Sequence, residues 1–255
     1  VIINSLKQKR DIIKSPFSWL FTIKGLSFDN FVKAFNQMNF LNAFKNSLVV
    51  TVTATVLVTV LAAMLAYYIV RNVNVFSNII FALMVASMII PFQAIMIPLV
   101  SVYGGTLNIL NHRLTLIFMH TGFSMAMSVF MFHGFIRGSI PLALEEAAYI
   151  DGAGYGRTMI SVIFPMAQPS IITIILFNFL SFWNEYIISM TLMSSTKAPR
   201  TLPVGLLNLM QAQQSAAQYG TMYAGLVLVM LPTLILYICV QRQLTQGMTV
   251  GGLKG

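Results

Sequence analysis

The amino-acid sequence predicts an all-α membrane protein, a polytopic bundle of transmembrane helices. Hydrophobic residues occupy 57% of the 255 positions and charged residues only 8%, whereas soluble domains carry about 25% charged residues. Long intervals without Asp, Glu, Lys or Arg separate a few polar zones, and they are long enough for helices that cross a bilayer, which need about 20 residues. The single cysteine, Cys239, lies in an apolar run, which excludes disulfides and cysteine-based metal sites within the chain.

Five of these intervals are predicted to be transmembrane spans. Between Lys45 and Arg71 lie 25 uncharged residues, which suit one span. Between Arg71 and Arg113 lie 41, and because prolines and a Gly-Gly pair interrupt them, we expect one long kinked span followed by a short polar turn. The predicted spans cover residues 46–70, 76–103, 114–136, 166–192 and 222–240.

The N-terminal residues predict a further helix upstream. The opening, VIINSLKQKR, places apolar residues before the basic ones, the reverse of the order in a cleavable signal peptide. We interpret this as the end of a transmembrane helix, so a first helix is expected before Val1.

Three polar zones lie between or beside the spans. Residues 4–45 hold seven of the fifteen Lys and Arg and are expected to form short amphipathic pieces outside the membrane. Residues 193–220 form a second zone, and residues 137–157 form a central island with five of the chain's charged residues. Counted by side, ten Lys and Arg share the side of residues 4–45 and five share the side of the island. The positive-inside rule therefore places the island outside the cell.

The central island is predicted to fold as two short helices around a glycine corner. Pro141 suits a first helical turn, and the early carboxylates Glu145 and Glu146 favour the positive end of a helix dipole. Gly152 offers a left-handed C-terminal cap. A second helix is expected from Arg157 to Phe164. Such a compact knob suits docking into a cleft of a soluble partner, whereas an ordinary polar loop is the simpler alternative.

Several kinds of chemistry lack support in the sequence. The basic residues do not cluster with stacking aromatics, so nucleic acid is set aside as a partner. The segment GAGYGRT has glycines but no phosphate-binding lysine, so no nucleotide loop is expected. His120 and His133 lie thirteen residues apart, without the spacing that joins two ligands on a helix face. We expect no catalytic residue, no metal ligand and no cofactor on this chain.

One motif in the island resembles a known family. Glu146-Ala147-Ala148, three residues, Gly152, nine residues and then Val162-Ile163-Phe164-Pro165 resemble the EAA motif of permease subunits of ATP-binding-cassette (ABC) importers. Val162 and Phe164 replace the Ile and Leu of the family pattern and preserve its apolar character. The segments NSLVVTVTAT, IIPFQAIMIPL, FWNEYI, TLPVGL and GMTVGGLKG are similar to the carbohydrate branch with maltose-type permeases, so the resemblance covers nearly the whole chain.

The resemblance implies a function and a topology. It implies a multi-pass permease in the bacterial cytoplasmic membrane, which moves a carbohydrate by alternating access, with a second homologous permease, two ATPase subunits and an extracytoplasmic solute-binding protein as partners. ATP and Mg²⁺ would then be held by the ATPases. It places residues 137–165 and 241–255 in the cytoplasm, against the charge count, and residues 4–45 and 193–220 outside. The residues expected to couple the chain to an ATPase are Glu145, Glu146, Ala147, Ala148, Asp151 and Gly152.

Two further groups of residues are candidates for contacts with the substrate or the binding protein. Pro91 and Gln93 in the kinked span and Trp183, Asn184, Glu185 and Tyr186 near the end of the fourth are candidates for the substrate pathway. A packing kink and a solvated span end are the simpler interpretations. In the glutamine-rich segment NLMQAQQSAAQY, the candidates for binding-protein contact are Asn208, Gln211, Gln213 and Gln214; a solvated linker is the alternative.

An ion-coupled secondary transporter or channel is the competing function. Such carriers usually show several paired intramembrane polar groups and inverted repeats. Only Glu185 is an acidic residue near the membrane interior, and no repeat is visible. A membrane-bound enzyme would need a cluster of His and acidic residues, which the sequence does not supply.

Overall fold

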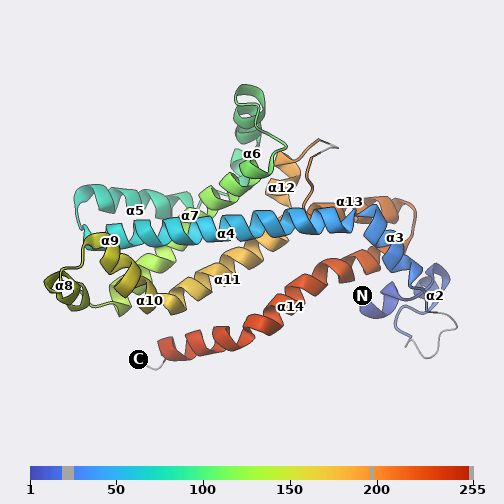
Figure 1. Ribbon diagram of the computed structural model, residues 1–255. Coiled ribbons are helices and arrows are strands. Elements are labelled where there is room, and N and C mark those ends of the chain that lie inside the picture. Colours follow the sequence, from blue (N-terminus) through green and yellow to red (C-terminus); the bar gives the residue numbers. More distant parts are fainter. Residues whose placement is uncertain (19–25, 196–197, 253–255) are drawn as a thin grey trace. The chain divides into compact units, whose positions relative to one another are not determined.

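The computed structural model describes residues 1–18, 26–195 and 198–252, and these fold entirely as helices, turns and loops (Figure 1). The sequence expectations for residues 4–45, 193–220 and 241–255 include residues 19–25, 196–197 and 253–255, which lie outside the described ranges. The elements in chain order are α1 (Ile2–Ser5), α2 (Lys9–Lys14), α3 (Asp29–Gln37), α4 (Phe40–Arg71), α5 (Val75–Ser87), α6 (Phe92–Val100), the π-helix η2 (Ser101–Thr106), α7 (Arg113–Ser139), α8 (Ala143–Ile150), α9 (Tyr155–Thr158), the π-helix η3 (Met159–Ile163), α10 (Phe164–Met166), α11 (Gln168–Asn184), α12 (Ile187–Leu192), α13 (Leu202–Ser215) and α14 (Tyr219–Gly252).

The chain divides into two compact units. The first unit contains residues 1–51, 103–116 and 183–240, and the second contains residues 52–102, 117–182 and 241–255.

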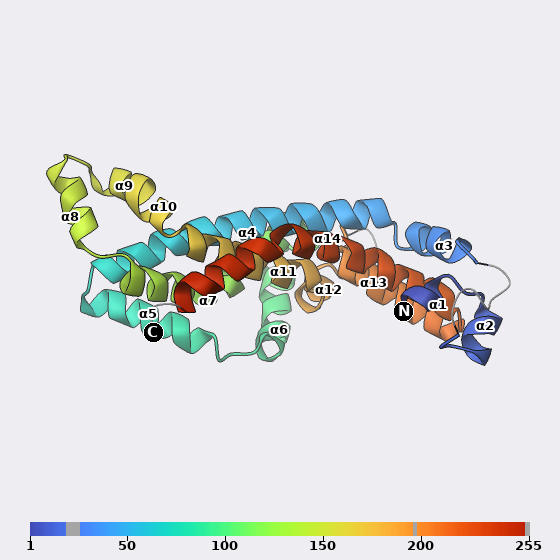
Figure 2. The ribbon, with the colours of Figure 1, turned by 90° about the horizontal axis from the view of Figure 1, so that it is seen from below.

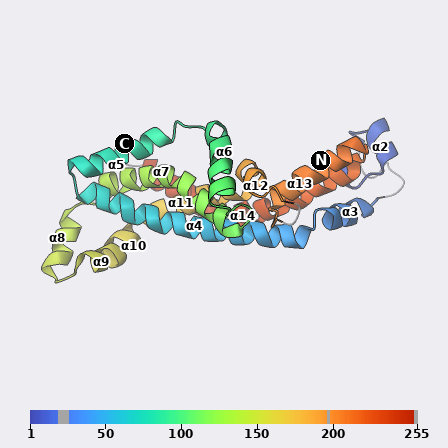
Figure 3. The same ribbon diagram turned by 90° about the horizontal axis from the view of Figure 1, so that it is seen from above.

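Small residues on α4 organise the core of the second unit. Ala62, Ala63 and Ala66 are buried there and allow α7 to approach closely with Phe132 and Ile136. The same cluster includes Ile140, Ile163, Ala167 and Ile174. In all three views α8 lies beyond the ends of the neighbouring helices of this unit, and α9 leads back from it toward α10 (Figures 1, 2 and 3).

Polar side chains fasten the segments of the first unit. The amide of Asn46 on α4 donates to the backbone carbonyl of Arg200 at 3.0 Å, and the hydroxyl of Ser47 accepts from the backbone N–H of Leu202 at 2.7 Å. Gln213 donates to Gln37 at 2.6 Å. The first two bonds hold the start of α13 against α4, and the third holds the end of α13 against the end of α3.

Two helices are long and apolar enough to cross a membrane alone, within the residues that the structure describes. They are Phe40–Arg71 and Arg113–Ser139, which contain the predicted spans 46–70 and 114–136. Two bent pairs raise this number to four if each pair is one span. Helix α14 covers the predicted span 222–240, continues to Gly252 through part of the predicted tail, and has an apolar portion from Tyr219 to Ile235.

The predicted kinked span over 76–103 consists of separate helices instead of one continuous helix. Helix α5 ends at Ser87 and α6 begins at Phe92, and the two are bent by 96°. Pro91, the N-cap of α6, has an extended backbone. Because an extended residue interrupts the helical backbone, α5 cannot continue through it. Pro98 lies inside α6, and the chain then winds into a π-helix.

The prediction of one span over 166–192 also needs correction. Helix α11 begins at Gln168, bent by 77° from the preceding Tyr155–Met166 segment, and ends at Asn184. Helix α12 restarts at Ile187. The polar zone 193–220, expected to be a loop, contains the fourteen-residue helix α13, whose long run of Leu, Met, Gln and Ala favours a helix.

A buried lysine closes the N-terminal segment of the first unit. The Nζ atom of Lys7 donates to the carbonyls of Ser15 and Pro16 at 3.0 and 3.2 Å, and lies 3.3 Å from the Ser18 hydroxyl. Lys7 is 0% exposed. Its charge is therefore satisfied by backbone oxygens, as a buried ammonium requires.

We expect Lys7→Met to loosen residues 9–18, because it removes a charged donor and leaves two carbonyls without their partner, at a cost of about 1–3 kcal/mol. Hydrogen–deuterium exchange of the full chain in detergent would show faster exchange there. The matched control is Lys9→Met, since Lys9 is exposed and reaches only the Ala216 carbonyl at 3.5 Å. Equal exchange in the two variants would contradict the assignment.

Candidate functional site

The central island folds as the sequence predicts, with two short helices around a glycine corner. Glu145 and Glu146 lie in the first turn of α8. Gly152 has φ +78°, its N–H donates to the Tyr149 carbonyl at 3.0 Å, and the N–H of Ala153 donates to the Ala148 carbonyl at 2.9 Å. This pair of bonds is a Schellman motif, which needs a left-handed residue and favours glycine. The C-terminal cap at Gly152 is confirmed.

The second half of the island is also helical but not uniform. Gly154 has extended backbone and begins α9, where the Thr158 hydroxyl donates to the Gly154 carbonyl at 3.2 Å. The chain then widens into the π-helix η3 before α10. The expected helix from Arg157 to Phe164 thus lies within the helical segment Tyr155–Met166, which α9, η3 and α10 form together.

Most of the predicted coupling residues lie on the surface of the island. Glu146, Ala147, Asp151 and Gly152 are exposed, and Ala148 is half-buried. Apolar side chains accompany them: Ile150 is 86% exposed, and Leu142 and Tyr149 are also exposed. The outer face of α8 therefore combines carboxylates with uncovered apolar groups, the composition of a protein-binding surface.

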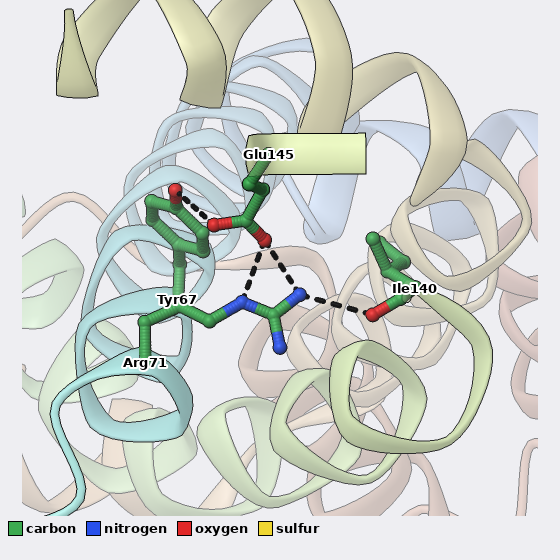
Figure 4. A network of polar contacts seen from close by, with 4 residues as sticks. All are labelled: Tyr67, Arg71, Ile140 and Glu145. Atoms are coloured by element: carbon green, nitrogen blue, oxygen red, sulfur yellow. Dashed lines mark hydrogen bonds and ion pairs between the residues drawn. The ribbon is translucent and has the colours of Figure 1, made fainter. Parts of the chain in front are cut away.

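Glu145 differs from the other predicted coupling residues because it is buried (Figure 4). One carboxylate oxygen, Oε2, accepts a hydrogen bond from the Tyr67 hydroxyl at 2.9 Å. The other, Oε1, lies 2.6 Å from both Nε and Nη2 of Arg71. Glu145 therefore faces α4 and does not lie on the exposed surface of α8, so any part that it plays in coupling acts through α4.

The guanidinium of Arg71 joins two segments of the second unit. Its Nη2 also donates to the Ile140 carbonyl at 3.0 Å, just before Pro141. Both carboxylate oxygens of Glu145 and two nitrogens of Arg71 are thereby used. Removing one partner of such a buried pair typically costs about 3–5 kcal/mol, since the other charge is left uncompensated.

Tyr67 also contacts the second short helix of the island. Its ring lies 5.0 Å from that of Tyr155 between centroids, with the planes tilted by 33°. Burial, followed by the nearby Tyr149 and Glu145, raises the pKa of the Tyr155 phenol above its usual range. Tyr155 therefore stays neutral at physiological pH and acts here as a packing group.

The sequence alone did not identify Tyr67 or Arg71 as site residues. Arg71 marked the end of a charge-free interval, and Tyr67 is one of several aromatic residues in a span. Their separation of four residues, which puts them on one helix face, is the only signal, and it does not reveal a partner 74 residues further along the chain.

Two of the predicted pathway residues have structural roles. Trp183 is buried, and its ring packs edge-on against Phe44 with centroids 5.7 Å apart. Glu185 accepts from the N–H groups of Ile188 and Ser189 and from the Ser189 hydroxyl, at 2.5, 3.1 and 3.1 Å. It thus caps the start of α12, which explains why an acidic residue occurs in this otherwise apolar part of the sequence.

The other pathway candidates are accessible. Asn184 and Tyr186 line a small cavity of about 260 Å³ in the first unit, whose other walls are apolar. That cavity is completed by Pro203, Leu206, Leu207, Met210 and Val229. Pro91 and Gln93, at the start of α6 in the second unit, are exposed, and the neighbouring Phe92 packs against Phe123.

The glutamine-rich candidates occupy different positions on α13. Gln211 and Gln214 are exposed, whereas Gln213 is buried and its amide donates to Gln37. Asn208 lines a polar pocket of about 390 Å³ in the first unit. Its other walls are Gln37, Met38, Asn39, Asn42, Ala43, Asn46, Arg113, Ala198, Pro199, Arg200 and Gly205.

The two span histidines each pack against an aromatic ring. His120 lies 4.8 Å from the Phe182 ring and His133 lies 4.1 Å from the Phe81 ring, between centroids. Within residues 1–18, 26–195 and 198–252, no three His, Cys, Asp or Glu side chains form a group able to hold a metal ion.

Comparison with known proteins gives consistent matches along the chain. Residues 58–250 match the family described as binding-protein-dependent transport system inner membrane component. The "Probable starch degradation products transport system permease protein AmyC" of Thermoanaerobacterium thermosulfurigenes is 33% identical, over 100% of this chain and 89% of that protein. The melibiose/raffinose/stachyose import permease protein MelC of Bacillus subtilis is 30% identical, over 100% of this chain and 90% of that protein.

A solved structure has the same fold. A chain in the crystal structure of a bacterial ABC transporter involved in the import of the acidic polysaccharide alginate matches with a TM-score of 0.74 and 21% identity. The match covers 94% of this chain and 87% of that one.

The matched family and its relatives disfavour an ion-coupled carrier or channel. The exposed two-helix island on a frame of apolar helices agrees with the EAA resemblance of its sequence. This chain belongs to the family of inner-membrane permease components of binding-protein-dependent ABC transport systems.

Proposed function

We propose that this chain is one of two homologous permease subunits of an ATP-driven importer, and that it moves a carbohydrate, an oligosaccharide above all, by alternating access. Two ATPase subunits would hold ATP and Mg²⁺, and the permease itself would perform no catalysis. The names of MelC and of the diacetylchitobiose uptake permease NgcG of Streptomyces coelicolor, which is 31% identical over 100% of this chain, support an oligosaccharide substrate.

The observation that carries this proposal is the form of the central island. It presents an exposed face with Glu146, Tyr149, Ile150 and Asp151, while its inner face is tied to a transmembrane helix through Glu145. A partner protein can therefore bind the exposed face of the island, while the inner face transmits the movement of the island to the transmembrane helix. In this proposal residues 137–165 are cytoplasmic, five spans cross the membrane, and residues 193–220 are extracytoplasmic.

The docking of α8 on an ATPase would use its apolar tip and its acidic face. Ile150 and Leu142 would enter an apolar groove, because their exposed surface is stabilised when water is removed. Glu146 and Asp151 would pair with basic residues at the rim and set the orientation.

The polar pocket at the start of α13 is the proposed contact for the solute-binding protein. Arg113 and Arg200 line it with five carboxamide side chains, and in the described part of the chain no acidic residue belongs to its walls. Its backbone is held by the bonds from Asn46 and Ser47. Because guanidinium groups bind carboxylates in a planar, paired geometry, the pocket suits an acidic side chain of the binding protein.

The cavity beside Asn184 and Tyr186 is the proposed point of contact with substrate. A tyrosine ring and apolar walls suit the carbon face of a sugar ring, and the Asn184 amide and the Tyr186 hydroxyl can bind its hydroxyl groups. Pro91 and Gln93 remain proposed pathway residues, since their helix is broken and its end is exposed.

We expect Glu146→Lys to reduce the amount of ATPase that co-purifies with the permease at least tenfold, because it reverses a charge on the docking face. Gly152→Ala is expected to act in the same direction, since a left-handed conformation costs a non-glycine residue about 1–2 kcal/mol. The measurement is quantitative pull-down after co-expression with the neighbouring transport genes.

The matched control is Gly156→Ala. A Cβ atom at Gly156 meets nothing within 4 Å and its backbone is not left-handed, whereas Gly152 has φ +78°. If no ATPase co-purifies with the unchanged chain, the importer proposal fails. If Glu146→Lys binds the ATPase normally, the proposed docking face is wrong.

We expect Arg113→Glu and Arg200→Glu together to weaken capture of the solute-binding protein at least tenfold, with a loss that shrinks as salt is raised, because screening weakens charge pairs. The readout is binding of labelled binding protein to the reconstituted importer. Lys45→Glu is the control, since Lys45 is an exposed cation on α4 outside the pocket. An equal effect of Lys45→Glu would indicate general charge attraction instead.

We expect Tyr186→Ala to lower the maximal rate of oligosaccharide uptake about tenfold while the ATPase stays bound, because the ring that faces the sugar is lost. Uptake by reconstituted vesicles measures this. Met230→Ala is the control, being next to the cavity residue Val229 but not among the cavity walls. Unchanged uptake in Tyr186→Ala would remove this cavity from the pathway.

A further inference from the structure

We propose that Tyr67, Arg71 and Glu145 form the connection through which movement of the coupling loop reaches helix α4. Glu145 is thus a positioning residue, and its disruption separates ATP hydrolysis from transport without releasing the ATPase. This inference rests on the proposed importer function and assigns a role within it to two residues of a transmembrane helix.

The carboxylate of Glu145 is held by one helix from two directions (Figure 4). Tyr67 donates to one oxygen at 2.9 Å and Arg71 contacts the other at 2.6 Å. Because Tyr67 and Arg71 are four residues apart, they lie on one face of α4. A rotation or shift of α8 must therefore carry the last turn of α4 with it or break both contacts.

Arg71 also fixes the segment that leads into α8. Its bond to the Ile140 carbonyl holds the chain just before Pro141, at 3.0 Å, while its contact with Glu145 holds the first turn of α8. The guanidinium thus binds the chain on both sides of the short connection between α7 and α8, at Ile140 and at Glu145. Movement of α8 cannot be absorbed by bending this connection alone.

Tyr67 extends the connection to the other side of the glycine corner. Its ring packs on Tyr155 of α9, 5.0 Å between centroids. Both short helices of the island therefore contact Tyr67 of α4, α8 through Glu145 and α9 through Tyr155. The island and the end of α4 should therefore move together.

A buried charge pair suits this task better than apolar contact. Apolar packing also joins the island to the unit, through Ile140 and Ile163, but it is not directional and allows sliding. The Arg–carboxylate contact has a defined geometry, and a partly separated pair leaves two charges out of water and unpaired. Intermediate positions are therefore disfavoured, and the island stays in one orientation on α4.

The first test uses the complete importer, reconstituted with its ATPases and binding protein. We expect each single variant, Glu145→Gln or Arg71→Glu, to retain the ATPases in pull-down. In each, the number of sugar molecules moved per ATP hydrolysed should fall at least fivefold. The exchanged pair, Arg71→Glu with Glu145→Arg, is expected to recover at least half of the wild-type ratio. A role in stability alone would lower transport and hydrolysis together and leave this ratio unchanged.

The second test measures the connection itself in the isolated full-length chain. Cys239 is first replaced by Ser, and spin labels are placed at Ile150 and Tyr68, which are both exposed. Pulsed electron paramagnetic resonance then measures the distance between the island and α4. We expect Glu145→Gln to broaden the distance distribution at least twofold. Arg137→Glu, which reverses an exposed arginine of α7, is the control and should leave the width unchanged.

The outcomes separate this inference from the proposed function. If the wild-type importer shows no ATP-dependent uptake, the proposed function fails, and the spin-label experiment still decides whether Glu145 holds the island. If the wild type transports and Glu145→Gln keeps the wild-type ratio of transport to hydrolysis, the inference is overturned. An unchanged distance distribution in Glu145→Gln also overturns it.

Discussion

The buried contact between Arg71 and Glu145 is the constraint on which the arrangement of the central island depends. It places a unit charge pair in a mostly apolar unit, at 2.6 Å and with the Tyr67 hydroxyl as third member. The buried core of this unit is mostly Ala, Val, Ile and Phe side chains, whose packing is not directional, whereas the charge pair has a defined geometry. The exposed face of α8 follows from it, because fixing Glu145 inward turns Glu146 and Ile150 outward.

Three charged side chains have partners within the fold that satisfy them. Lys7, Glu185 and Glu145 are satisfied by backbone carbonyls, by the N–H groups of α12 and by Arg71 with Tyr67, respectively. Each of these groups would be costly to bury alone. Their side chains therefore act as fixed points of the fold. The side chains of Asn184, Tyr186, Arg113 and Arg200 instead line two cavities of the first unit.

Sequence patterns predicted the local structure of the island closely and its contacts less well. The glycine cap at Gly152 and the helix before it follow from interactions within a few residues, so propensity and spacing were sufficient. The sequence did not reveal the internal contacts of Glu145, Trp183 and Gln213, because the partner of each lies far away in the chain: Arg71, Phe44 and Gln37. A polar residue in an apolar sequence looks functional whether it faces a ligand or an internal partner.

By itself, the sequence determined that the chain is a helical membrane protein and that the island has two short helices around Gly152. These properties depend on composition, hydrophobic runs and the backbone preferences of proline and glycine. Only the tertiary structure decided that the segment around Pro91 turns by 96° and that Glu145 faces inward. The sequence could not fix these two features, because a break's angle and a side chain's direction depend on which distant residues pack against them, and Arg71 is 74 positions away from Glu145.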